Sequence, residues 1–141
     1  MNTLNEREIA ALHTALDDEH HAWATYDQVI RDFGLVRPFG NIRDAETRHL
    51  DALLGLFERY GVPVPANPWP GRVERYPTLH DACIAAVAAE VANAVLYERL
   101  LASTTRPELL RSSAICRKLP SSGTCAPSGV ASSVADDHPG E

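Results

Sequence analysis

Glu46 and His49 are the residues of this sequence whose types and spacing most directly suggest chemistry. Residues three apart lie one turn apart on the same face of a helix, so both side chains point the same way. That face is apolar, and its positions step by three or four: Phe39, Ile42, Glu46, His49, Leu53, Phe57 and Tyr60. A carboxylate and an imidazole on a buried stripe need partners, because an unpaired buried charge is strongly destabilising.

Three long amphipathic helices are predicted to position such side chains. The first begins at Thr3 or Asn5, either of which can cap a helix, and runs to about residue 33. The second covers 38–60 and the third covers 78–102. A glycine, the usual residue beyond a helix C-terminus, follows each of the first two. The link between these two is short, which predicts antiparallel neighbours.

The segment 62–77 connects the second and third helices and contains five prolines, which exclude a helix there. Fully extended, it reaches about 50 Å at ~3.3 Å per residue. A bundle of such helices is only about 30–35 Å tall at ~1.5 Å per residue. The third helix can therefore begin at the opposite end and run parallel to the second. The predicted fold is an all-α antiparallel helical bundle with one long crossover, the arrangement of ferritin-like folds.

Glu19, Glu46, His49 and Glu90 each lie near the middle of a predicted helix and on its apolar stripe. The predicted topology places all four in one layer of the bundle. A Glu-x-x-His pair facing the interior of a bundle is the ligand unit of di-iron and di-manganese carboxylate proteins. Buried carboxylates repel one another, and a divalent cation reverses the sign of that interaction. Oxygen-rich ligation with one imidazole favours iron or manganese over a closed structural zinc site.

Salt bridges are the rival explanation for the buried carboxylates. Arg43 or Arg48 could reach Glu19 or Glu46, although both arginines lie off the apolar stripe. We favour the metal site because the arginines lie off the stripe, while three carboxylates at one level repel one another and are costly to desolvate.

The same residues belong to longer motifs that resemble the ferritin-like superfamily, and within it a bacterial and archaeal family known only as a domain of unknown function. These motifs are ALDDEHHAWATY at 15–26, PFGNI at 38–42, the Glu46-x-x-His49 pair and AEVANAVLYERLL at 89–101. The resemblance spans about residues 5–111. It depends on the motifs together, because an isolated Glu-x-x-His is a weak signal.

The resemblance implies metal binding by Glu19, Glu46, His49 and Glu90, with iron, or alternatively manganese, as the cofactor. It further implies ferroxidase-type oxidoreductase chemistry on dioxygen or peroxide. Tyr26 and Tyr97 would lie beside the ligands as redox neighbours, although core packing with a bonded hydroxyl is the reading we prefer for both. In the superfamily a second Glu-x-x-His on a fourth helix completes a two-metal centre.

This chain departs from the family at that fourth helix. Its start is clearly signalled at 105–108, but 112–141 is rich in Ser, Pro and Gly and contains no aromatic residue. We therefore assign 1–111 to the ferritin-like helical domain and 112–141 to a disordered tail, with the fourth helix truncated or disordered. Shifting the reading frame of GC-rich codons for 112–129 permits a second Glu-x-x-His, so we interpret the tail as a frameshifted product of a mutation or a sequence error. The site would then be impaired, holding one metal.

A non-catalytic helical module that forms a homodimer is the alternative function, because loss of the fourth helix would expose apolar stripes. The net charge of −6 and the absence of a basic block argue against nucleic acid as a partner. No signal peptide and no eighteen-residue apolar stretch is recognisable, so we expect a cytoplasmic protein without a membrane span. The cysteines, Cys83, Cys116 and Cys125, are odd in number and lack zinc-ligand spacing, and Cys83 is expected to be a buried apolar residue.

Overall fold

Local capping signals determine where the first helix begins. In this computed structural model, which describes residues 3–116, α1 spans Glu6–Phe33. Asn5 is its N-cap: the Asn5 side chain accepts a hydrogen bond from the Glu8 backbone, and the Glu8 side chain accepts one from the Asn5 backbone. This reciprocal capping box satisfies two of the amide groups that a helix N-terminus leaves open. Of the two cap residues that the sequence allowed, the structure uses Asn5.

The second and third helices match the predicted bounds to within one residue at their starts. α2 spans Phe39–Tyr60 and ends at Gly61, whose φ of 63° and ψ of 28° lie in the left-handed region that glycine adopts without strain. α3 spans Leu79–Ala102, and the Thr78 side chain caps it by accepting a hydrogen bond from the Asp81 backbone. The all-α prediction is confirmed over the described residues, where every regular element is a helix.

A fourth helix is present, although it is short. α4 spans Pro107–Cys116, ten residues against 24 in α3. The helix thus continues five residues past the boundary at Arg111 that the sequence suggested, because Leu109 and Cys116 are buried against the other helices. Tertiary packing overrides the weak helix propensity of the serines between them. The predicted disorder of 117–141 lies outside the described residues.

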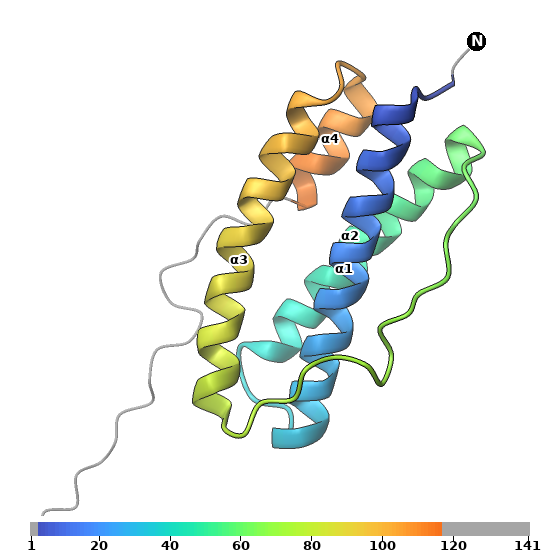
Figure 1. The fold of residues 1–141 in the computed structure, drawn as a ribbon. Helices are drawn as coiled ribbons and strands as arrows, with labels where there is room; N and C mark the ends of the chain where they lie inside the picture. The colour runs from blue at the N-terminus through green and yellow to red at the C-terminus, as the bar shows by residue number, and fades with distance from the viewer. Residues whose placement is uncertain (1–2, 117–141) are drawn as a thin grey trace, which may run out of the picture.

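Figure 1 shows the directions of the four helices: α1 descends, α2 ascends beside it, α3 ascends again and α4 descends. The segment 62–78 returns along the length of the bundle between α2 and α3, which therefore run in the same direction (Figure 1). α1 contacts α2 and α3, and α4 contacts the same two helices. Each helix accordingly has two neighbours around a common interior.

The connector is held against α1 by contacts between polar and aromatic side chains. The Trp69 indole donates a hydrogen bond of 2.9 Å to Asp17, and its ring stacks on His21 at a centroid distance of 4.1 Å. Near the end of the connector, Arg75 pairs with Asp32. These contacts guide a proline-rich chain along the bundle without helix or strand.

The interior consists of two apolar clusters. The first cluster lies around α4 and contains Leu12, Ala15, Leu16, Leu53, Leu56, Phe57, Tyr97, Leu100, Leu109 and Cys116. The second cluster lies near the α1–α2 turn and contains Tyr26, Val29, Phe39, Ala82 and Ala86. Glu19, Glu46 and His49 fall between the two clusters in sequence along α1 and α2 and are buried. A polar layer thus separates two apolar layers at mid-bundle.

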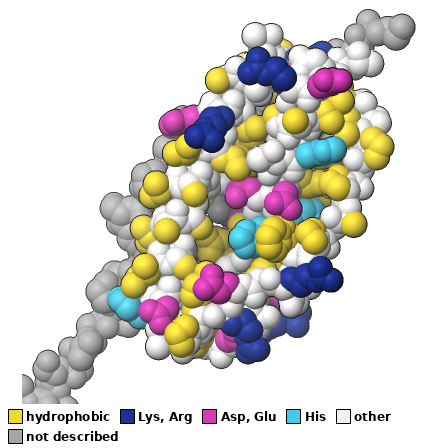
Figure 2. Space-filling view, in the orientation of Figure 1, with side chains coloured by type: hydrophobic (Ala, Val, Ile, Leu, Met, Phe, Trp, Pro, Cys, Tyr) yellow, Lys and Arg dark blue, Asp and Glu magenta, His cyan; other side chains and the backbone are white. Residues whose placement is uncertain are grey.

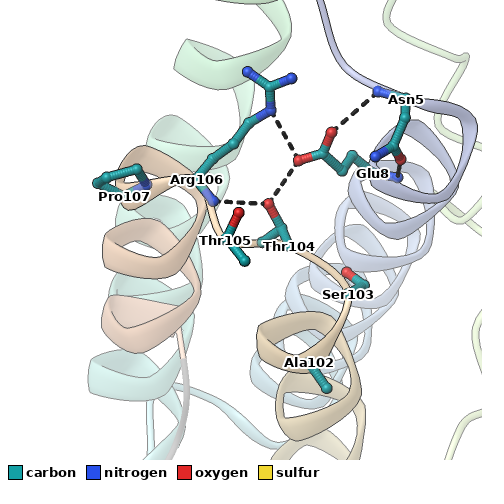
Figure 3. A pocket seen from close by; sticks show the side chains of 8 residues that line it. All are labelled: Asn5, Glu8, Ala102, Ser103, Thr104, Thr105, Arg106 and Pro107. Carbon is teal, nitrogen blue, oxygen red and sulfur yellow. Dashed lines mark hydrogen bonds and ion pairs between the residues drawn. The ribbon is translucent and has the colours of Figure 1, made fainter.

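Glu8 connects the start of α1 to the turn between α3 and α4 (Figure 3). Glu8 is buried, with 3% of the residue exposed. Its carboxylate accepts hydrogen bonds from the Thr104 hydroxyl at 2.6 Å and from the Arg106 guanidinium at 2.9 Å. Burial acts to raise the pKa of Glu8, but these hydrogen bonds, the Asn5 backbone donor and the Arg106 charge together lower it. The network fixes the level at which α4 enters the bundle.

We expect Glu8→Gln to lower the free energy of unfolding at pH 7 by about 1–2 kcal/mol, because charge-assisted hydrogen bonds are lost. The folded-state pKa lies below the ordinary value of 4.5, so this stabilisation is complete above pH 4.5 and disappears as the pH falls through the folded pKa. Urea melts from pH 3 to 8 would measure it, with Glu6→Gln, an exposed glutamate of the same helix turn, as the control. A constant difference down to pH 3 would contradict the assignment.

Candidate metal centre

Glu19, Glu46 and His49 meet between α1 and α2. Both glutamates are 0% exposed and His49 is 8% exposed. His49 Nδ1 lies 3.4 Å from Glu19 Oε2 and 3.5 Å from Glu46 Oε2. Because Glu46 and His49 are one turn apart on α2 and Glu19 faces them from α1, the antiparallel packing brings the three together, as the sequence predicted.

Two atoms of this group have no hydrogen-bond partner among the described residues, namely Glu19 Oε2 and His49 Nδ1. Buried polar atoms are nearly always hydrogen-bonded, so such a pair calls for a physical explanation. In a tetrahedral site with metal–ligand distances of about 2.0–2.1 Å, neighbouring donor atoms are roughly 3.3–3.4 Å apart. The separation of 3.4 Å between these two atoms fits that geometry. The donors present therefore fit a small divalent cation.

The protonation of His49 determines whether its ring nitrogen can bind a metal. Burial and, to a lesser extent, the neighbouring Arg48 charge lower the pKa of His49 and so favour the neutral imidazole. A neutral imidazole nitrogen can bind a cation, whereas a protonated one cannot.

Arg43, one of the two arginines considered as salt-bridge partners, pairs elsewhere. Its guanidinium donates to Asp27 at 2.8 Å. Arg48 is exposed on the outer face of α2. This arrangement weakens the salt-bridge explanation for Glu19.

Tyr97 orients one side of the site. It is fully buried, and its hydroxyl donates a hydrogen bond of 2.7 Å to Glu19 Oε1. Burial strongly raises the pKa of Tyr97, so the hydroxyl remains a donor. With Oε1 occupied by this bond, Oε2 faces His49. Tyr97 thus lies beside a proposed ligand and also has the bonded hydroxyl expected of core packing.

Tyr26 occupies a different environment. It belongs to the second apolar cluster, where its ring packs at 6.0 Å from that of Phe39. This is the packing role that the sequence left open for it.

Glu90 is buried on α3, at 9% exposure, and burial raises its pKa. Its carboxylate is not in the group of donor atoms that converge within the described residues. Tyr97 is the residue through which α3 reaches Glu19, and Glu90 lies seven positions before it, two turns or about 10 Å along the helix. Of the four predicted ligands, the converging group contains Glu19 and His49; Glu46 lies outside it but has Oε2 3.5 Å from His49 Nδ1.

Cys116 is the member of the site that sequence reasoning missed. It is 0% exposed, and its Sγ, Glu19 and His49 each offer one ligand atom within 4.8 Å of the others. The thiol donates to the His49 carbonyl at 3.8 Å. Burial raises the pKa of Cys116 to about 11, and a hydrogen bond with Tyr97 opposes that shift. The available signal was the start of α4 at Pro107, from which the helix carries Cys116 inward.

The comparisons with known proteins add no relative. No protein-family model, no curated protein and no solved structure matches this chain.

Proposed function

We propose that this chain is a ferritin-like, carboxylate-based metal-binding protein that holds one divalent ion, iron or manganese, between α1 and α2. The observation that carries the proposal is the pair of buried donor atoms, Glu19 Oε2 and His49 Nδ1, which face each other at 3.4 Å without hydrogen-bond partners among the described residues. Glu46 supplies the second carboxylate, 3.5 Å from the same nitrogen.

The protein's own groups have separate tasks in this proposal. Glu19 and Glu46 provide negative charge to balance a dication, and neutral His49 provides a nitrogen donor. Tyr97 holds Glu19 in its rotamer by the bond to Oε1. The two apolar clusters exclude water from either side of the polar layer. An iron ion bound there would supply ferroxidase-type or oxygen- and peroxide-handling redox chemistry.

A single ion is proposed because the sequence contains one Glu-x-x-His, at Glu46 and His49. A two-metal centre of the bundle type uses a second such pair on another helix. We infer that chemistry requiring two adjacent ions is impaired in this chain. Glu46 is kept in the proposed ligand set because its Oε2 lies 3.5 Å from His49 Nδ1, although it is no more a member of the converging group of Glu19, His49 and Cys116 than Glu90 is.

Anaerobic titration of the full chain with Fe²⁺ or Mn²⁺, followed by calorimetry and thermal melts, tests the proposal. We expect binding of about one ion per chain and a higher melting temperature. Saturation at 100 times the dissociation constant stabilises a fold by about 2.7 kcal/mol, which for a domain of this size raises Tm by roughly 5–10 °C. Absence of both heat and a Tm shift would contradict the metal site.

A second candidate function, homodimerisation, is favoured by one surface of α3. Four large apolar side chains on successive turns are exposed there: Ile84 56%, Val87 49%, Val91 58% and Val95 45%. Figure 2 shows hydrophobic side chains along the edge where α3 lies. By length and composition α3 could also cross a membrane, because an 18-residue stretch of it has a mean hydropathy of 1.5 and only 22% of that stretch is buried inside the protein. We propose a second copy of the chain as the occupant, because the stripe is self-complementary.

Sedimentation velocity over a range of protein concentrations, without detergent, tests this candidate. A sedimentation coefficient that rises with concentration supports self-association through α3. A constant monomeric value would contradict it, and recovery of the protein only in detergent or on lipid vesicles would indicate a membrane partner instead.

A further inference from the structure

Two helices deliver their side chains to the same level of the bundle. α1 and α4 both descend from the end where Glu8 meets Arg106 (Figure 1). From Glu8 to Glu19 the rise along α1 is about 16 Å, and from Pro107 to Cys116 the rise along α4 is about 14 Å, at ~1.5 Å per residue. Cys116 therefore lies at the level of Glu19, as the separation of at most 4.8 Å between their ligand atoms confirms.

Metal-donor atoms of Glu19 and His49 lie close to the Cys116 sulfur and have no hydrogen-bond partners among residues 3–116. Sγ donates to the His49 backbone carbonyl at 3.8 Å, not to the ring nitrogen. His49 Nδ1 and Glu19 Oε2 remain without hydrogen-bond partners among residues 3–116. One atom from each of the three side chains lies within 4.8 Å of the others. A contraction of about an ångström would bring all three donors to the spacing of a coordinated ion.

From this geometry we propose that Cys116 is a direct thiolate ligand of the ion held by Glu19 and His49, giving a mixed carboxylate, imidazole and thiolate site. The inference depends on the proposed metal site and deepens it by naming a ligand and the class of metal. On binding, the S–H bond breaks, its proton leaves to solvent, and sulfur donates an electron pair to the ion. No oxidant or reductant takes part.

Thiolate ligation determines which ions the site should prefer. Sulfur donors select thiophilic borderline ions such as Zn²⁺, Co²⁺ and Fe²⁺, whereas sites of carboxylate and water suit Mn²⁺ and Mg²⁺. A Cys116 thiolate would join Glu19 and Glu46 as an anionic donor to the dication, in a layer between two apolar clusters. We therefore expect discrimination against Mn²⁺ that a site of Glu and His alone would lack.

Titration of the full reduced chain with Co²⁺ tests the ligand directly. We expect a thiolate-to-cobalt charge-transfer band in the near ultraviolet and visible d–d bands of low-symmetry Co²⁺. Cys116→Ser should lose the charge-transfer band, bind Zn²⁺ at least about tenfold more weakly, and show a smaller Zn²⁺ to Mn²⁺ preference. Cys83→Ser, at a half-buried cysteine of α3, is the matched control and should keep the band.

The double variant Cys83→Ser/Cys125→Ser retains Cys116 as its only thiol, so a charge-transfer band in that chain can come from no other residue. This variant carries the test even if Cys116→Ser fails to fold. Visible d–d bands without a charge-transfer band would overturn the thiolate ligand and leave the proposed metal site intact. The absence of any spectral change with Co²⁺ would overturn both.

Discussion

Glu46→Ala should bind no metal at concentrations that saturate the unaltered chain, while its metal-free form should unfold no more easily. Glu46 is 0% exposed and lies in the same layer as fully buried Glu19. Without a cation these like charges repel in a poorly solvated interior, and each carries a desolvation penalty of several kcal/mol. Removing one of them removes this repulsion and desolvation penalty from the metal-free protein, and it also removes a ligand of the metal.

Glu46→Gln separates the charge from the volume of this side chain. It keeps the size of glutamate and should raise the metal-free free energy of unfolding by about 1–2 kcal/mol, whereas alanine adds a cavity that offsets part of the gain. Calorimetric titration with Fe²⁺ should show at least about a 100-fold loss of affinity in both variants. Urea melts of the metal-free proteins would measure the change in stability.

The exposed glutamate Glu58 of α2 provides the control, since Glu58→Gln should change neither quantity. A metal-free Glu46→Ala protein destabilised by about 3 kcal/mol or more would show instead that Glu46 is the structural partner of a buried cation. That result would remove the main support for the metal site.

Val91→Lys should keep the chain monomeric at concentrations where the unaltered protein self-associates. Val91 lies between Val87 and Val95 on the exposed face of α3 and is itself 58% exposed. Burying the exposed half of each large apolar side chain on the stripe contributes about 1 kcal/mol, or about 4 kcal/mol for each copy. Association opposes the ~8 kcal/mol of the two copies together with at least ~4 kcal/mol of lost freedom, so the expected dimer is weak, with a dissociation constant of about 1 mM or higher.

A lysine at position 91 places two like charges near the two-fold axis of an α3–α3 contact. Because the side chain is already exposed, the monomer's own stability should change by less than about 0.5 kcal/mol. Sedimentation velocity of both proteins, with Val64→Lys as a control at an exposed valine of the connector, measures the effect. Equal association of Val91→Lys and the unaltered chain would exclude α3 as the interface.

The helix ends could be predicted from the sequence because they depend on local chemistry. The Asn5 and Thr78 side chains each accept a hydrogen bond from a free backbone amide at a helix N-terminus. Gly61 ends α2 through its left-handed backbone conformation. The meeting of Glu19 with Glu46 and His49 was also predictable. It requires only the helical period and the antiparallel packing that a short link imposes on α1 and α2.

Choices between adjacent positions on α3 required the tertiary structure. The apolar pattern allowed Ala86 or Val87, and Asn93 or Ala94, to face inward. In the structure Ala86 and Asn93 are buried, and the Asn93 amide donates to Asp18 at 3.1 Å. α3 is apolar on nearly all sides, so its sequence carries little information about which face meets α1. The rotation of the helix is set by the two neighbours that it contacts.

For Glu90 and Cys116, the sequence gives the residue type and its local helix propensity, whereas contacts with distant residues decide where the side chain lies in the bundle. The sequence by itself identified Glu90 as a carboxylate on an apolar stripe, but the axial offset between α3 and α1 decides whether it reaches Glu19. Cys116 follows a serine-rich stretch with weak helical propensity, and its position depends on how far α4 continues into the bundle. Burial of Leu109 and Cys116 against α2 and α3 sets that length, and side chains distant in sequence provide the energy.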